Sequence, residues 1–129
     1  MKTNDVHYAL RGEAAAAFLA SLIAFALAGG SWPWFGILFF VPDLSILGYR
    51  GGNRWGAAAY NAVHSYALPL FLATLTCAWT WSAPSPLWLV WFAHIAFDRA
   101  LGYGLKFDAG FQYTHLGTMK TQKAPAEVR

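Results

Sequence analysis

Four side chains that could bind a metal ion or move a proton lie inside otherwise apolar stretches of this chain. They are Asp43, His64, His94 and Asp98. Carboxylates and imidazoles are common ligands of divalent metals, and both groups serve as general acids and bases. Ionisable side chains within a bilayer are costly, so they normally face the interior of a helix bundle and carry function there. We therefore expect these four residues to form one polar site.

The elements that must position this site are long apolar runs. The chain has 129 residues, of which 57% are hydrophobic and only 12% are charged, a balance that excludes an ordinary soluble domain. A helix needs about 20 residues to cross the hydrocarbon core. Four runs approach or exceed that length, and they cover residues 13–30, 32–49, 55–81 and 87–103.

Short Gly- and Pro-rich breaks separate the four runs, so consecutive helices should be antiparallel neighbours. The predicted fold class is an all-α integral membrane protein, an up-down bundle of four transmembrane helices with a short cytoplasmic C-terminal segment. Residues 1–117 would form the single membrane domain. Residues 118–129 read as a disordered tail. We expect the polar, aromatic segment that ends at Gly117 to fold back against the cytoplasmic mouth of the bundle.

The basic residues predict the orientation. Lys and Arg precede the first run, lie between the second and third, and follow the fourth, whereas the other two connections have none. By the positive-inside rule both termini are cytoplasmic, as expected for a multi-pass membrane protein with four spans. The net charge of +3 then indicates contact with membrane lipids rather than with nucleic acid. A single cysteine, Cys77, excludes a disulfide framework and a Cys-rich metal site.

Depth and spacing place the four residues in one layer. Asp43 lies roughly 15 Å from the outer end of the second helix, and His64 lies roughly 15 Å from the inner end of the third, at about 1.5 Å of rise per residue. His94 and Asp98 are four residues apart and share a helix face, as Asn61 and His64 do at a spacing of three. Pro42, directly before Asp43, and Pro69 are expected to bend the second and third helices.

Two imidazoles with two carboxylates, without thiolates, suit a divalent metal, with zinc favoured and manganese or iron as alternatives. Asp43, Asp98 or His115 could move protons during catalysis. Asn61, Ser65 and Arg99 are predicted as supporting polar groups.

Four segments together resemble a bacterial family of small membrane proteins known as domain of unknown function 4260. These segments are Val41-Pro42-Asp43-Leu44-Ser45, Tyr60-Asn61-Ala62-Val63-His64-Ser65-Tyr66, Ala93-His94-Ile95-Ala96-Phe97-Asp98-Arg99-Ala100-Leu101-Gly102-Tyr103-Gly104-Leu105-Lys106 and Thr114-His115-Leu116-Gly117. The resemblance covers residues 13–117 and implies a membrane protein without implying an activity.

A more distant likeness points to bacterial inner-membrane metal-dependent hydrolases. Their Pro-Asp, Thr-His-Ser and Ser-His-x-x-x-Asp elements look like Pro42-Asp43, Val63-His64-Ser65 and Ala93-His94 followed by Asp98. The likeness implies that Asp43, His64, His94 and Asp98 are metal-site residues. This chain departs from the pattern after its Pro-Asp, where Leu44 and Ser45 replace a second acidic residue and a histidine.

The leading interpretation is a membrane-embedded metal-dependent hydrolase acting on a lipid or lipid-linked substrate near the cytoplasmic leaflet. Three non-enzymatic alternatives stay open. His64 and His94 could be the axial ligands of a haem, the polar residues could form a proton or ion pathway, or they could only hold helices together. A homodimer is compatible with the alanine-rich helix faces.

Overall fold

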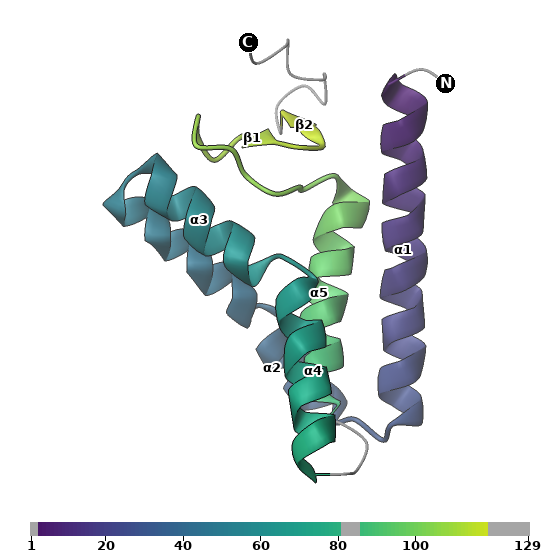
Figure 1. Cartoon of the computed structure of the whole chain (residues 1–129). Helices are drawn as coiled ribbons and strands as arrows, with labels where there is room; N and C mark the ends of the chain where they lie inside the picture. Colours follow the sequence, from purple (N-terminus) through teal and green to yellow (C-terminus); the bar gives the residue numbers. More distant parts are fainter. Residues whose placement is uncertain (1–2, 81–85, 119–129) are drawn as a thin grey trace.

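The computed structural model describes residues 3–80 and 86–118. Within these ranges the chain forms five α-helices, one 3-10 helix and a two-stranded hairpin (Figure 1). The elements are α1 (Thr3–Leu27), α2 (Trp32–Phe39), the 3-10 helix η1 (Val41–Gly51), α3 (Asn53–Val63), α4 (Ala67–Thr80), α5 (Leu87–Leu101), β1 (Tyr113–Thr114) and β2 (Gly117–Thr118). The helical fold class is confirmed. The predicted disordered tail lies, apart from Thr118, outside the described residues.

The apolar core lies where α1, α2 and α5 meet. α1 and α5 run side by side along most of their length (Figure 1). Phe25 of α1, Phe39 of α2 and the α5 residues Val90 and Ala93 are buried together there. Burying large apolar side chains against each other stabilises such a contact by about 1.5–3 kcal/mol per side chain in water. This core holds α5, which carries two of the four predicted ligands.

The second predicted helix, 32–49, is divided into α2 and η1. The division falls at Pro42, which has no backbone N–H and whose ring would clash with the carbonyl of the residue four positions earlier. The chain tightens there, and the N–H of Asp43 bonds to the carbonyl of Phe40, three residues back, at 3.1 Å. The expected local effect of Pro42 is therefore confirmed, and it fixes the backbone at Asp43.

The third predicted helix, 55–81, is also broken, into α3 and α4, which are bent by 42°. Pro69 accounts for the position of the break, because a proline ring excludes the carbonyl four residues earlier, here that of Ser65. α3 ends at Val63, so His64 lies in the break rather than inside a continuous helix. The bend expected at Pro69 is confirmed.

Side chains of α5 bond to the carbonyls that this break leaves without helical partners. The indole Nε1–H of Trp91 donates to the carbonyl of Val63 at 2.8 Å. Nη2 of Arg99 donates to the carbonyl of His64 at 3.1 Å. Unsatisfied carbonyls at a helix end are costly in an apolar environment. These two bonds therefore join the broken helix to α5 at the height of the predicted site.

The helices η1 and α3 form a closely packed pair that leans away from α1 and α5 (Figure 1). Gly52, at φ +104°, makes the turn between them. A Cβ on Gly48 would lie 2.8 Å from the Cβ of Ala59, and a Cβ on Gly56 would overlap the ring of Tyr49. Only glycine allows this approach, which brings Asp43 on η1 close to His64 at the end of α3.

Two helices of the described chain are long and apolar enough to cross a membrane, residues 4–27 and 32–51, or three if the bent α3–α4 pair counts as one span. α5 has 15 residues, fewer than the roughly 20 that a straight span requires. A membrane protein is therefore consistent with the structure. The four-span bundle stays a prediction.

The segment after α5 returns toward α3, as expected for the residues that precede Gly117. Gly102, at φ +95°, ends α5, and the N–H of Tyr103 bonds to the carbonyl of Asp98 at 2.8 Å, which is the usual glycine-terminated helix end. The chain then forms the β1–β2 hairpin, with Lys106 bridged to Thr114. This hairpin lies at the same end of the molecule as the start of α1 (Figure 1).

Asn61 attaches this hairpin segment to α3. Its Nδ2 donates to the carbonyl of Lys106 at 2.8 Å, and its Oδ1 accepts the N–H of Lys106 at 2.6 Å. Lys106 is buried, and its Nζ lies over the rings of Tyr60 and Phe111, at 4.8 and 4.0 Å from their centroids. Burial lowers the pKa of Lys106 to about 8, although Asp98 opposes the shift.

Replacing Asn61 by Ala is expected to loosen the hairpin. The buried peptide groups of Lys106 lose both partners, which costs about 2–3 kcal/mol. Trypsin should then cleave after Lys106 faster than in the wild-type chain, and the melting temperature in detergent should fall. Thr74→Ala is the matched control, because the exposed Thr74 hydroxyl donates to the carbonyl of Leu70 within α4. An unchanged cleavage rate at Lys106 in the Asn61 variant would contradict this attachment.

Candidate metal centre

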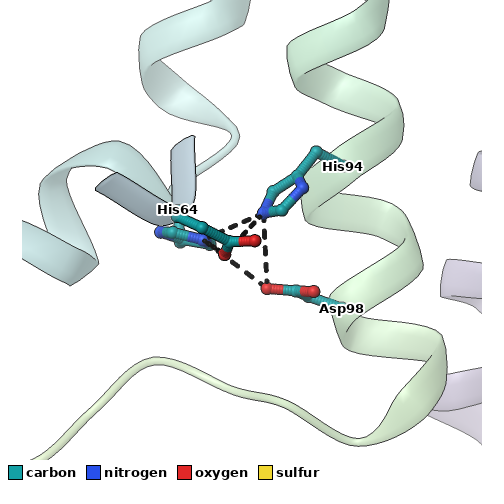
Figure 2. Close-up of side chains that lie close together, drawn as sticks. His64, His94 and Asp98 are labelled. Atoms are coloured by element: carbon teal, nitrogen blue, oxygen red, sulfur yellow. Dashed lines mark hydrogen bonds and ion pairs between the residues drawn. The ribbon is translucent and has the colours of Figure 1, made fainter. Parts of the chain in front are cut away.

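The four predicted side chains converge on one point between η1, the α3–α4 break and α5. His64 reaches it from the break, and His94 and Asp98 reach it from adjacent turns of α5 (Figure 2). Asp43 completes the group from the first turn of η1. One possible ligand atom from each residue lies within 4.8 Å of the other three. The spatial prediction drawn from helix depth and spacing is therefore confirmed.

The distances in the group that involve an imidazole nitrogen are short and nearly equal. The two imidazole Nε2 atoms are 3.1 Å apart. Oδ1 of Asp43 lies 3.6 Å from Nε2 of His64 and 3.3 Å from Nε2 of His94. Oδ2 of Asp98 lies 3.5 and 3.6 Å from the same two nitrogens. Neighbouring ligands of a tetrahedral ion with bonds of about 2.0–2.1 Å stand about 3.3 Å apart, so this spacing can hold a divalent ion.

Hydrogen bonds orient the His64 ring for ligation. Its Nδ1 lies 3.1 Å from the carbonyl oxygen of Tyr60, and a carbonyl only accepts, so Nδ1 must carry the proton and donate. The unprotonated Nε2 then faces the other three residues, which is the arrangement that metal-binding histidines usually show. The Tyr60 ring stacks on His64 with centroids 3.7 Å apart and limits its rotation.

Tyr60 also orients Asp98. Its hydroxyl donates to Oδ2 of Asp98 at 3.1 Å, and this is the same oxygen that faces both histidines. Tyr60 was not among the site residues predicted from the sequence. The spacing of four between Tyr60 and His64 places both on one helix face and was the signal that could have identified it.

His94 is enclosed by apolar groups. Phe39 packs against its ring with centroids 5.1 Å apart. Within the described chain its buried Nδ1 has no hydrogen-bond partner. The ring is therefore held by packing rather than by a hydrogen bond to its outer nitrogen, and it differs in this respect from His64.

Exposure differs among the four residues. The side chains of His64, His94 and Asp98 are 3%, 2% and 14% exposed, whereas that of Asp43 is 40% exposed. Beside Asp43 lies a largely apolar cavity of about 520 Å³, whose lining includes Pro42 and Leu44. Asp43 is not part of this lining, although both of its chain neighbours are, and it is the most exposed residue of the group.

The chemistry of the group fits a divalent cation and not a haem. Two carboxylates and two neutral imidazoles balance a charge of +2. A haem held by both histidines would have to lie between their nitrogens, yet these are 3.1 Å apart and share the space with two carboxylates. The spacing of the two histidines therefore leaves no room for a haem between them, which excludes the predicted haem alternative.

The remaining predicted residues lie around this group. Asn61 holds the hairpin segment, and Arg99 bonds to the His64 carbonyl. Ser65 Oγ accepts the N–H of Ala67 at 3.3 Å at the start of α4. Within the described chain, the hydrogen bonds of His115 join it to Leu105 and Arg99, and it does not belong to the four-residue group.

The chain belongs to the family described as "Domain of unknown function (DUF4260)", whose model matches residues 7–119. The match covers the four residues of the group and confirms the family resemblance drawn from the sequence. No curated protein and no solved structure matches the chain. The likeness to inner-membrane metal-dependent hydrolases therefore stays a prediction.

Proposed function

We propose that this member of the DUF4260 family is a membrane-embedded metal-dependent hydrolase acting on a lipid or lipid-linked substrate. The observation that carries the proposal is the mutual spacing of the four side chains, between 3.1 and 3.6 Å for the five atom pairs that include an imidazole nitrogen. Zinc fits a tetrahedral set of nitrogen and oxygen ligands best, and manganese or iron are the alternatives.

The proposal places the chain in the inner membrane of a bacterium, with both termini cytoplasmic and α5 as a fourth, short span. The distribution of Lys and Arg supports this orientation. The hairpin and the start of α1 lie at one end of the molecule (Figure 1), and this end would face the cytoplasm. The metal group would then lie in the cytoplasmic half of the bilayer.

A lipid substrate is supported by the route of access. The group opens on the side of Asp43, and the adjacent cavity is walled by Leu44, Val90 and Trp91 among other apolar residues. Apolar walls beside a few polar groups are typical of sites for hydrophobic ligands. The reacting group of a lipid could reach Asp43 while its chain lies in this cavity.

The residues divide into two roles. His64, His94 and Asp98 are the better enclosed ligands, and Tyr60 fixes the orientation of two of them. Asp43, the exposed member, is the residue placed to accept a proton. When bound, the divalent ion would supply the Lewis acidity that makes water nucleophilic near neutral pH. The predicted proton transfer by His115 is not part of this proposal, because its bonds lie at the hairpin.

Removing the metal tests this function. Purified protein treated with EDTA is expected to lose hydrolysis of its substrate, and zinc, manganese or iron should restore it. The assay is a panel of phospholipids, lipid phosphates and lipid-linked esters in mixed micelles, followed by mass spectrometry of the products. If reloaded protein turns over no member of the panel, the hydrolase proposal fails, although the metal site could still exist.

One observation favours a second candidate, a purely structural metal site. Four protein ligands that close a tetrahedron leave no free position, as in structural zinc sites. The structural reading predicts that metal removal lowers the melting temperature while no substrate is consumed in either state. The exposure of Asp43 favours the catalytic reading.

A further inference from the structure

A second cavity, of about 520 Å³, lies between α1, α4, α5 and the hairpin segment. Its polar lining consists of Glu13, Tyr66, Arg99 and His115. None of these residues belongs to the metal group. The volume is in the range of sites that bind small molecules.

Arg99 is the basic group in the lining of this cavity, and Glu13 is an exposed acidic one. The Arg99 guanidinium gives one hydrogen bond to the His64 carbonyl at 3.1 Å and lies 3.4 Å from Nδ1 of His115. Within residues 3–80 and 86–118 no carboxylate lies within ion-pairing distance of it. Guanidinium carries five N–H donors, so several remain for a ligand. Asp98 acts on this cation at longer range, and a partly buried guanidinium that forms no close ion pair favours binding of an anion.

His115 supplies a second donor. Its Nδ1 accepts the backbone N–H of Leu105 at 2.8 Å, so the proton of the neutral ring is on Nε2. Burial and the neighbouring guanidinium of Arg99 lower the pKa of His115, which keeps the ring neutral at neutral pH. Nε2–H can therefore donate to an anion that Arg99 attracts.

The rest of the lining is apolar. Ala14 and Ala17 of α1, Leu70 of α4 and Phe92 of α5 form the wall that continues from the polar end. Phe92 lies seven residues, two helical turns, before Arg99 on the same face of α5. The cavity is thus amphiphilic, with the donors of Arg99 and His115 near the hairpin, where Leu10 and Leu116 also line it, and with an apolar wall further along the helices.

This cavity is distinct from the metal centre. Helix periodicity places Phe92 and Arg99 on one face of α5 and the ligands His94 and Asp98 on another. The first face lines the cavity beside α1, and the second faces η1 and the α3–α4 break. Arg99 joins the two faces, because it lines the cavity and also donates to the His64 carbonyl.

We propose that this cavity binds a lipid with an anionic phosphate headgroup, with the phosphate at Arg99 and His115 and the alkyl chain along Ala17, Leu70 and Phe92. The phosphate matches the N–H donors of the guanidinium that the His64 carbonyl does not use, since Arg recognises phosphate oxygens through paired N–H donors. The orientation also matches the proposed topology, because headgroups lie at the cytoplasmic surface. The site does not depend on the metal centre or on hydrolysis.

The test is binding of dodecyl phosphate to EDTA-treated full-length protein in amphipol, measured by calorimetry. Metal-free protein is used so that phosphate cannot bind at the four-residue group. Wild-type protein is expected to bind dodecyl phosphate, and inorganic phosphate and dodecyl maltoside should each bind much more weakly. Arg99→Gln should weaken dodecyl phosphate binding by about tenfold or more, the usual worth of hydrogen bonds to a charged group.

Glu13→Gln is the matched control, because it removes an exposed carboxylate from the same cavity. Its affinity for dodecyl phosphate should equal or exceed that of the wild-type chain. Should Arg99→Gln fail to fold, Ala17→Phe fills the apolar wall and is expected to abolish binding with Arg99 intact. Equal affinity of Arg99→Gln and wild type, or of Ala17→Phe and wild type, would overturn the proposal. Inorganic phosphate binding as tightly as dodecyl phosphate would replace the lipid with a free anion.

Discussion

The double variant His64→Ala/His94→Ala is expected to purify without metal, whereas the wild-type chain should carry about one divalent ion per molecule. The two Nε2 atoms are 3.1 Å apart within the group, so removal of both imidazoles deletes all of the nitrogen ligands. The two remaining carboxylates would have to hold the ion alone. Elemental analysis of detergent-purified protein for zinc, manganese and iron gives the answer directly.

The matched control is His7→Ala/His115→Ala, which removes the same number of imidazoles from outside the group. This control should retain the full metal content. Melting curves of both variants show whether each remains folded. The metal proposal is wrong if the wild-type chain and the His64/His94 variant have the same metal content. It is also wrong if the wild-type chain binds no metal even after reconstitution.

The sequence predicted the meeting of the four ligands because few physical quantities decide it. Apolar runs and short breaks fix which helices are neighbours, and helix rise fixes depth. The spacing of His94 and Asp98 places both on one face of α5. Polar side chains in an apolar segment also have few places to go other than toward one another. Each of these constraints depends only on the residues within one segment or on their order along the chain, so the sequence alone reveals it.

The interruptions of the helices were only partly predictable. Pro42 and Pro69 indicated bends, but the 3-10 geometry of η1 depends on the close approach of α3 at Gly48 and Gly56. The break at His64 likewise depends on Trp91 and Arg99 of α5, which donate hydrogen bonds to the carbonyls that the break leaves free. Such tertiary partners decide between a bent helix and a broken one. These partners come from other segments, so the residue spacing within one helix does not reveal them.

The roles of individual polar residues were the hardest to predict. Asn61 shares a helix face with His64, yet its amide holds the backbone of Lys106, 45 residues later in the chain. His115 was a candidate for proton transfer, but the hairpin places it beside Arg99 and Leu105. The positions of Lys106 and His115 depend on the course of the chain after Gly102. The glycine predicts where α5 ends, but it does not predict the direction that the chain then takes.

The two carboxylates of the group are expected to respond differently to the same substitution. Asp98→Asn should lose most of the bound metal, because Asp98 is 14% exposed, lies on rigid α5 and is oriented by Tyr60. Asp43→Asn should keep metal at saturating concentration but lower the turnover by about 10²–10⁴-fold, the usual contribution of a general base. Asp43 is 40% exposed and lies beside the apolar cavity.

Metal content and turnover, measured on the same preparations, separate the two roles. An amide has the shape of a carboxylate without its charge or basicity, so both variants should keep the fold. If Asp43→Asn loses metal as completely as Asp98→Asn, all four residues are ligands. The tetrahedron would then be closed, and the structural metal site would replace the hydrolase. If Asp43→Asn keeps both its metal content and its turnover, Asp43 is not the general base. The substrate would then not reach the metal from the side of Asp43.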